Sequence, residues 1–546
     1  MKNSLLMRKT FLFAILTFSF SIVSGQQIIQ STKKNIKVIV NGKTVNWTIS
    51  PEANPDRLEV YCSKGKNEVI FQTNIDTAYF YVANRDTLKF KIVVNSNDTV
   101  YTEIIGVKDL PNKISTDNKI YWLSQIWSET KYNFVNIDKL KFNLDSLYKS
   151  FIPVVKATNN DYDYYRELER FMANLHDGHS EISAGGQFRS FTDYIPLSLQ
   201  DFDKRIYITS VRKIPTLDST WIGAELIEID GISTIKYLET KIFPFISAST
   251  EQHLWMQGIH NLQGGLRDQS FKGKIRKRDD KVFNIELQRN GEATRTDNDQ
   301  YWGPRYSYSR NIVDFKWLKG NIAFVSFNRF SPENIAIKEF DAIAKELYKA
   351  KGVIIDLRNN GGGSTGVAIH LQKYLTKGKY FLNYAWETRT NDAVRKANGN
   401  WKDEYKNYFL NQAYRFEKGD TVLVPDTLKR ITCPTAILIG RFTFSAAEDF
   451  LVNLYEAPNR PILIGEETGG STGSPLVVPD LPGGGYARIC TRRICYPQSE
   501  KRFVNCGVKP DVEVKQTIDD YLQMKDLVLE RAIKEIKTTH NTRLDR

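Results

Sequence analysis

The sequence predicts a multidomain protein that combines α+β and α/β architecture. Its 546 residues are more than one hydrophobic core normally supports, and two to four domains are expected. Short runs of alternating apolar and polar residues occupy the first hundred positions, which is typical of strands. Beyond Trp317, apolar strands alternate with amphipathic helices, which favours a layered β/α domain.

Residues 1–25 have the pattern of a secretory signal peptide. Lys2, Arg8 and Lys9 precede an apolar stretch from Phe11 to Val23, and small residues follow it. About 13 apolar residues are too few for a span that needs about 20. We therefore expect export to the periplasm or the extracellular space, and no integral membrane segment after removal of the leader.

The charge of the chain is basic but dispersed. The formal net charge is +13, and the mature chain without its three leader cations carries +10. The basic run Lys274–Arg278 is followed directly by Asp279 and Asp280. Nucleic-acid binders gather basic residues on one face with aromatic residues between them, so no nucleic-acid partner is expected.

Five cysteines are present, and an odd number in an exported chain leaves at least one free thiol. Their spacing matches no zinc pattern. Cys490 and Cys495 flank a short segment that could form a hairpin, so a local disulfide between them is possible.

The first three segments after the leader are expected to be a β module, a helical segment and a second β module. Residues 26–110 alternate in short strands and predict a β-sandwich-like module for docking or spacing. Residues 111–190 show helical spacing, with a helix from Tyr164 to Leu175 that stops at His176-Asp177-Gly178-His179. Residues 191–295 contain strands at 205–211, 223–231 and 283–289. Such small modules commonly bind an extended peptide as an added strand.

Residues 296–546 are expected to form the β/α-layered catalytic domain. Strands are predicted at 321–327, 353–357, 436–440 and 462–465, and helices at 335–348, after the Gly361–Gly363 run, and at 445–455.

Ser445 is the most informative single residue. It lies a few residues after a buried strand and opens a helix, so its hydroxyl sits beside unpaired backbone N–H groups in the positive field of the helix N-terminus. Such donors can stabilise the oxyanion of acyl transfer. The alternative is structural, because Ser is a favoured N-cap and Glu448 completes a capping box.

A glycine-rich segment follows the strand at 353–357. Gly361, Gly363 and Gly366 fit the dinucleotide-binding spacing, and Glu387 follows about 20 residues on. Two features oppose that interpretation. An exported protein rarely meets a nicotinamide cofactor, and this strand ends in polar residues.

The His176-Asp177-Gly178-His179 segment holds two of the six histidines. It could bind a metal, it could simply cap a helix with solvated side chains, or one histidine could be the general base of a distant serine.

Five motifs occur in order and together resemble one family. They are Leu175-His176-Asp177-Gly178-His179-Ser180, Ile354–Gly363, Thr443–Glu448, Ile464–Gly470 and Gly507–Asp511. The sequence resembles the tail-specific (C-terminal processing) and tricorn-core peptidases from about Asp117 to Val514. The resemblance implies a PDZ-like module at 196–291, with Ser445 as nucleophile and the N–H groups of Gly362 and Ala446 as oxyanion hole.

The resemblance also bears on the base. Ser471 stands where the tail-specific branch has a lysine, so a Ser–Lys dyad is not expected, and His179 matches the base of the tricorn-like branch. Two positions depart from that branch: Val504 replaces a glutamate and Gly178 replaces a serine. Glu448 and Glu467 are the remaining candidates to orient His179.

We therefore expect an exported serine endopeptidase that acts on peptides or unfolded proteins without a metal or cofactor. The alternatives are a weak or inactive binding protein on the same scaffold and, with less support, a nucleotide-dependent enzyme.

Overall fold

The computed structural model describes the chain in two degrees of detail. Between residues 29 and 105 it gives the backbone of strands. From residue 110 to residue 539 it gives side chains as well, except at 190, 268, 290–300, 305–308, 310, 500 and 504, and the last helix continues as backbone to Leu544. The expected signal peptide and Val504 lie outside the described residues.

The N-terminal strands form two antiparallel four-stranded sheets with the orders β3-β2-β1-β6 and β5-β4-β7-β8. These strands fall within residues 26–110, where short alternating strands are predicted. The bounds are β1 (Ile29–Thr32), β2 (Asn35–Val40), β3 (Lys43–Thr48), β4 (Leu58–Lys64), β5 (Asn67–Thr73), β6 (Thr77–Ala78), β7 (Thr87–Val94) and β8 (Asp98–Ile105).

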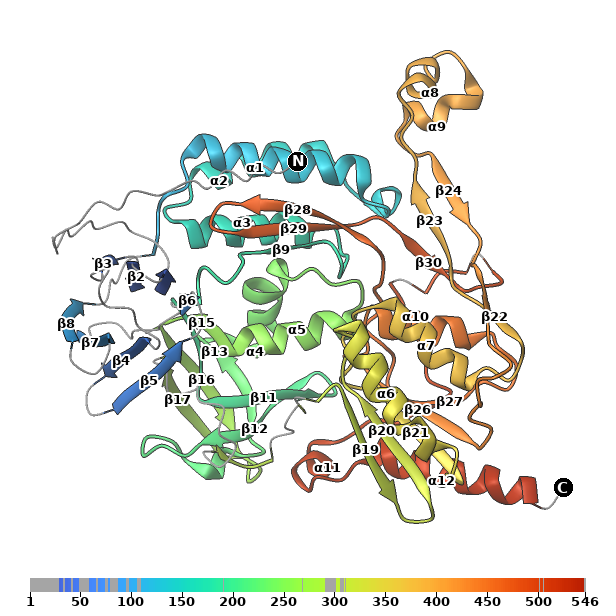
Figure 1. The fold of residues 1–546 in the computed structure, drawn as a ribbon. Helices are drawn as coiled ribbons and strands as arrows, with labels where there is room; N and C mark the ends of the chain where they lie inside the picture. The colour runs from blue at the N-terminus through green and yellow to red at the C-terminus, as the bar shows by residue number, and fades with distance from the viewer. Residues whose placement is uncertain are drawn as a thin grey trace, which may run out of the picture.

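A helical layer follows and packs on strands that come from near the C-terminus (Figure 1). The predicted helix at 164–175 is α3, whereas α2, with Pro153 inside it, was not predicted. Strand β9 pairs with β29 across about three hundred residues of chain. The bounds are α1 (Thr116–Asn133), α2 (Leu144–Lys156), α3 (Asp161–Ala173), β9 (Glu181–Ser183), β28 (Pro475–Leu481) and β29 (Gly485–Cys490).

Cys490 is a free thiol buried in this layer, so the possible Cys490–Cys495 disulfide is not formed. The expected hairpin is also absent here, because β29 pairs with β28 and β9 while β30 (Arg493–Cys495) pairs with β23 (Ala385–Arg389).

The next unit is an antiparallel sheet of order β11-β12-β13-β16-β17, covered by helix α5. Asp230 and Gly231 both have positive φ and make the tight turn predicted after the strand at 223–231. The sheet takes β18 from beyond residue 300 as a further partner of β12. The bounds are β11 (Leu197–Phe202), β12 (Arg205–Arg212), β13 (Glu225–Ile229), β16 (Ser270–Arg276), β17 (Val282–Gln288), β18 (Tyr301–Trp302), α4 (Thr234–Tyr237) and α5 (Glu251–Gln263).

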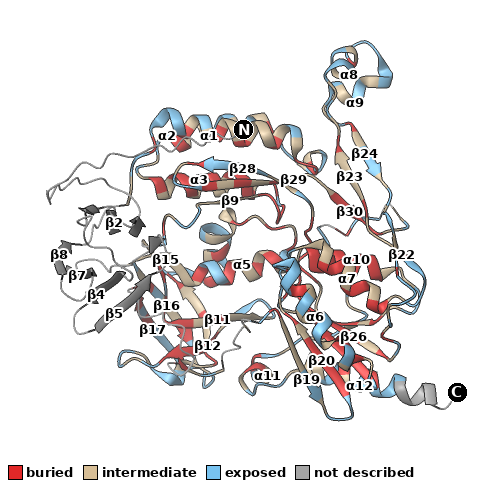
Figure 2. Cartoon of the chain, in the orientation of Figure 1, coloured by how far each residue is buried: buried red, intermediate tan, exposed pale blue. Residues whose placement is uncertain are grey.

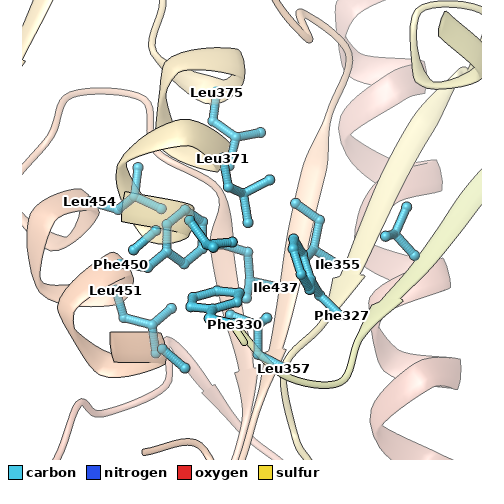
Figure 3. Packing of buried hydrophobic residues seen from close by; sticks show 14 of the residues in the cluster. Phe327, Phe330, Ile355, Leu357, Leu371, Leu375, Ile437, Phe450, Leu451 and Leu454 are labelled. Atoms are coloured by element: carbon cyan, nitrogen blue, oxygen red, sulfur yellow. The ribbon is translucent and has the colours of Figure 1, made fainter. Parts of the chain in front are cut away.

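The central sheet has the order β19-β20-β21-β26-β27-β31, and all of it is parallel except the β19–β20 pair. Alternate residues of a strand point to opposite faces. Ile355 therefore packs with α6, α7 and α10, while Ile354 packs with α12 (Figures 1 and 3). The bounds are β19 (Val313–Leu318), β20 (Ile322–Phe327), β21 (Gly352–Asp356), β26 (Thr435–Ile439), β27 (Ile462–Gly465), β31 (Val512–Glu513), α6 (Glu333–Leu347), α7 (Thr365–Leu375), α10 (Ala446–Tyr455) and α12 (Leu527–Leu544).

A hairpin arm of β23 and β24 (Tyr414–Glu417), tipped by α8 (Ala393–Asn398) and α9 (Lys406–Phe409), projects from the body (Figure 1). Its tip is largely exposed, in contrast to the buried strands of the central sheet (Figure 2). The mixed α+β multidomain class is thus confirmed.

Candidate active site

Ser445 sits where the central sheet turns into α10. It follows β26 by a short loop and is the N-cap of the helix, with Glu448 in a capping box. Its backbone has φ +55° and ψ −128°, and a non-glycine residue in such a region costs about 1–3 kcal/mol. The capping interpretation and the nucleophile interpretation are therefore compatible, because the strained turn presents the hydroxyl outward from the helix end.

His179 is held by the buried turn that follows α3. Asp177 accepts hydrogen bonds from the His179 N–H at 2.9 Å, from the Ser180 hydroxyl at 3.0 Å and from Asn136 at 3.2 Å. The imidazole stacks on the Phe444 ring with 4.8 Å between centroids and 8° between planes. The ring is therefore fixed from its backbone and from one face.

The imidazole lies between two serine hydroxyls. His179 Nε2 is 3.0 Å from Ser445 Oγ, and His179 Nδ1 is 2.8 Å from Ser471 Oγ. If Nε2 accepts the Ser445 proton, Nδ1 carries hydrogen and donates to Ser471. The structure thus brings together Ser445 and His179, which the sequence singled out, and adds Ser471, which the sequence marked only as the position of a missing lysine.

Neither of the two glutamates considered as orienting groups touches His179. Glu448 accepts hydrogen bonds from the Thr468 hydroxyl and from the backbone N–H groups of Gly470 (2.7 Å) and Ser471 (3.0 Å). It therefore shapes the loop that carries Ser471. Burial raises the pKa of Glu448 to about 8, against the effect of these donors.

The ring nitrogens of His179 contact Ser445 and Ser471, and not Glu467. Partial burial raises the pKa of Glu467. The expectation that Glu448 or Glu467 contacts His179 is therefore wrong for the described residues, and a hydroxyl takes that place. Sequence spacing could not show this, because only the folded loop brings Ser471 to Nδ1.

The two predicted oxyanion donors lie side by side but differ in availability. A Cβ added at Gly362 would stand 2.7 Å from Ser445 Cβ and 2.9 Å from the Ala446 nitrogen, and φ at Gly362 is +95°. The Gly362 N–H donates to Asn360 Oδ1 at 2.9 Å. Within the described residues the Ala446 N–H forms no hydrogen bond, so it is the available donor.

The imidazole of His179 is neutral at physiological pH. Burial lowers its pKa to about 3, and the positive charge of Arg488 and the neighbouring His253 add to the effect. A neutral imidazole can accept a proton, which is the state that a general base requires.

The competing interpretations find less support in this geometry. Among residues whose placement is described, no group of three His, Cys, Asp or Glu side chains is arranged to hold a metal. Glu387, which would hold a ribose in the dinucleotide interpretation, instead accepts hydrogen bonds from Arg493 at 3.1 Å and Arg502 at 2.7 Å. No helix of the described chain is long and apolar enough to span a bilayer.

Comparisons with known proteins find similarity to peptidases. Residues 321–514 match the model of peptidase family S41. This part of the chain is therefore similar to the S41 peptidases. Carboxy-terminal processing protease CtpA of Bacillus subtilis (strain 168) is 28% identical over 226 residues, which are 41% of this chain and 41% of that protein. The match thus spans less than half the length of this curated S41 relative.

Solved structures show the same fold. Mature CPAF in complex with lactacystin is 15% identical, with a TM-score of 0.57 over 78% of this chain and 98% of that one. Mature CPAF without that compound is 14% identical, with a TM-score of 0.57 over 78% and 96% of the two chains. The fold shared with CPAF therefore extends beyond the segment that matches the family model.

Proposed function

We propose that this protein is an exported serine peptidase that cleaves peptides or unfolded proteins through an acyl-enzyme on Ser445. One observation carries the proposal: the 3.0 Å contact between Ser445 Oγ and His179 Nε2. It occurs on a strained strand-to-helix turn, which exposes a nucleophile in hydrolases of several folds. The match of residues 321–514, which include Ser445, to peptidase family S41 supports serine peptidase chemistry.

The proposed reaction follows from the positions of these groups. His179 Nε2 removes the Ser445 proton as Oγ attacks the peptide carbonyl carbon, and the Ala446 N–H donates to the oxyanion. Gly362 would be a second donor if its N–H turned from Asn360 to the substrate. The imidazolium then protonates the leaving amine, and water hydrolyses the ester by the same route in reverse.

Ser471 is the proposed positioning residue for His179. Its Oγ accepts the Nδ1–H at 2.8 Å, which fixes the tautomer with Nε2 free to accept. A hydroxyl has no negative charge to stabilise the imidazolium, unlike the aspartate of the usual triad. We therefore expect a turnover rate below that of a peptidase with a charged third residue. An inactive binding protein on this scaffold, the alternative, would show no turnover.

The remaining parts of the proposal concern place and substrate. The signal-peptide pattern of residues 1–25 supports export to the periplasm or cell exterior. The antiparallel module around α5 is proposed to be PDZ-like and to bind an extended peptide at a strand edge. The relative CtpA is described as a carboxy-terminal processing protease. We therefore propose that this protein cleaves its substrates near their C-termini.

The test uses a fluorophosphonate probe, which reacts with activated serines. Mature wild-type protein should be labelled, and Ser445→Ala should not be. His179→Ala should label at least a hundredfold more slowly, since loss of a general base costs roughly 10²–10⁴ in rate. Equal labelling of all three proteins, or no labelling of the wild type, would contradict the proposal and favour a binding protein.

A further inference from the structure

A cavity of about 500 Å³ adjoins the candidate active site. Its wall includes Gly178, Gly361 and Phe444, which immediately precede His179, Gly362 and Ser445. The rest of the wall comes from α3, from β9 and β29, and from the α5 module. A substrate held at Ser445 would place a neighbouring side chain in this cavity, so its chemistry bears on specificity.

The charges in the cavity wall are paired with one another. Arg166 forms an ion pair with Glu169, and its guanidinium lies 4.2 Å from the centre of the Phe245 ring. Arg488 forms an ion pair with Glu181. Two positive and two negative groups leave no net charge, and a charged substrate side chain would lose hydration without gaining an unpaired opposite charge.

Two nitrogen atoms in the same wall are buried without partners among the described residues: His253 Nδ1 and Arg488 Nε. His253 is only 5% exposed, and burial lowers its pKa to about 4, so it is neutral at pH 7. A guanidinium Nε is always a donor. His253 Nε2 lies 3.4 Å from Gln257 Nε2. With the Gln257 amide as the donor of that contact, the imidazole hydrogen is on Nδ1.

The position of His253 links these donors to the reactive centre. Its ring packs on Phe444, the residue before Ser445, with 4.6 Å between centroids. A side chain at Gly178 would come within 3.2 Å of His253 Nδ1 and 3.0 Å of Phe444. The glycine thus leaves room beside His253 where the tricorn-like pattern has a serine.

We propose that this cavity receives an uncharged side chain with a carbonyl oxygen, that of Gln or Asn, next to the cleaved bond, and that His253 and Arg488 donate to that oxygen. The inference rests on the proposed peptidase function and names its substrate class. A neutral wall disfavours Asp, Glu, Lys and Arg. Two unpartnered donors disfavour purely apolar side chains, which would leave those donors unpaired.

The test compares fluorogenic peptides in which one position at a time carries Gln, Glu, Leu or Lys. The varied positions lie on both sides of the cleaved bond. At one position, kcat/KM for Gln should exceed that for Glu and Leu by about tenfold. Rates are normalised to the fraction of Ser445 that the fluorophosphonate labels. Equal rates for Gln, Glu and Leu at every position would overturn the inference.

Two variants sharpen the test. Glu181→Gln leaves Arg488 without its carboxylate, so the position that preferred Gln should now accept Glu, with the Gln-to-Glu ratio inverted. His253→Phe should reduce the preference for Gln over Leu at that position. Glu346→Gln, the same change as at Glu181 but at a surface ion pair with Lys349 on α6 outside the cavity, is the matched control and should keep the wild-type ratios.

The outcomes separate the two proposals. Labelled wild-type protein that hydrolyses peptides without a Gln preference, or a Glu181→Gln variant with unchanged ratios, would contradict the cavity assignment alone. Wild-type protein that is neither labelled nor hydrolytic would contradict the proposed function, and the cavity assignment would fall with it.

Discussion

Ser471 gives His179 a hydroxyl partner in the place where serine peptidases usually have a carboxylate. The contact is short and buried, and Glu448 holds the backbone of the Ser471 loop. A neutral acceptor can fix the tautomer of the imidazole, but it adds little to the stability of the cation formed during acylation. The weak stabilisation of the His179 imidazolium by Ser471, rather than substrate binding, should therefore limit the rate of catalysis.

Ser471→Ala should lower kcat by roughly tenfold with little change in KM, because the lost hydrogen bond contributes about 1 kcal/mol and fixes the proton on Nδ1. Ser471→Thr, which keeps a hydroxyl, should restore most of the rate. Steady-state kinetics on a fluorogenic peptide measure both. An alanine variant with wild-type kcat would show that Ser471 does not position His179.

Activity should fall on the acid side of the pH profile, its acid limb, only at a pH well below the usual pKa range of histidine. The base acts when deprotonated, and the pKa of His179 is lowered to about 3, so kcat/KM should stay flat as pH falls from 7 to 5. Since the positive charge of Arg488 helps to lower this pKa, Arg488→Gln should move the limb to higher pH. A wild-type limb near pH 6.5 would contradict the assignment.

At the scale of elements, two loops at the carboxyl ends of parallel strands build the reactive centre. The segment after β21 carries Gly361 and Gly362, and the segment after β26 carries Ser445. Ligand sites in open α/β sheets form at this edge. The backbone of one loop touches the backbone of the other at Gly362, where a side chain has no room.

Gly362→Ala should abolish labelling of Ser445 and destabilise the fold. The new methyl would stand 2.7 Å from Ser445 Cβ and 2.8 Å from the Phe444 carbonyl oxygen, and positive φ alone costs an alanine about 1–2 kcal/mol. Gly361→Ala is the control, because nothing lies within 4 Å of its added Cβ. Thermal melts and probe labelling compare them, and equal behaviour of the two variants would count against this contact.

At the scale of the whole molecule, the start of α5 joins the antiparallel module of β11–β17 to the turn of His179 and to the loop of Ser471. Ser249 accepts the Gly178 N–H at 2.8 Å, next to His179. Thr250 donates to the Gly469 carbonyl at 2.7 Å and Gln252 to the Thr468 carbonyl at 2.8 Å, on the loop that leads to Ser471. The turn that carries His179 and the loop that carries Ser471 are thus both supported from a different module.

Thr250→Val should reduce kcat severalfold, because the nearly isosteric valine removes the hydrogen bond to the Ser471 loop and leaves a carbonyl unpaired, at about 1–3 kcal/mol. Thr240→Val is the matched control, since its hydroxyl bonds only to the Lys236 carbonyl on an exposed helix. Kinetics and thermal melts of both variants test the prediction. A Thr250→Val variant with unchanged kcat would show that α5 does not support the active site.

Several helices and strands could be predicted from the sequence. Helix α3, strands β12, β20, β21 and β26 and helix α10 fall within a few residues of the predicted positions, because each has a clear apolar period and a capping or glycine stop. Helices α2 and α5 were not predicted. The pairing of β9 with β29 could not be predicted, since residues three hundred apart carry no local signal of their contact.

The sequence by itself predicted Ser445 as nucleophile, His179 as base and peptidase chemistry, because strand, turn and helix signals around Ser445 are local and the motifs occur in order. Only the tertiary structure decided what faces the second imidazole nitrogen, which oxyanion donor is available, and which module supports the site. Those features depend on distances between Ser471, His179 and the start of α5, and such distances arise only when separate parts of the chain pack together.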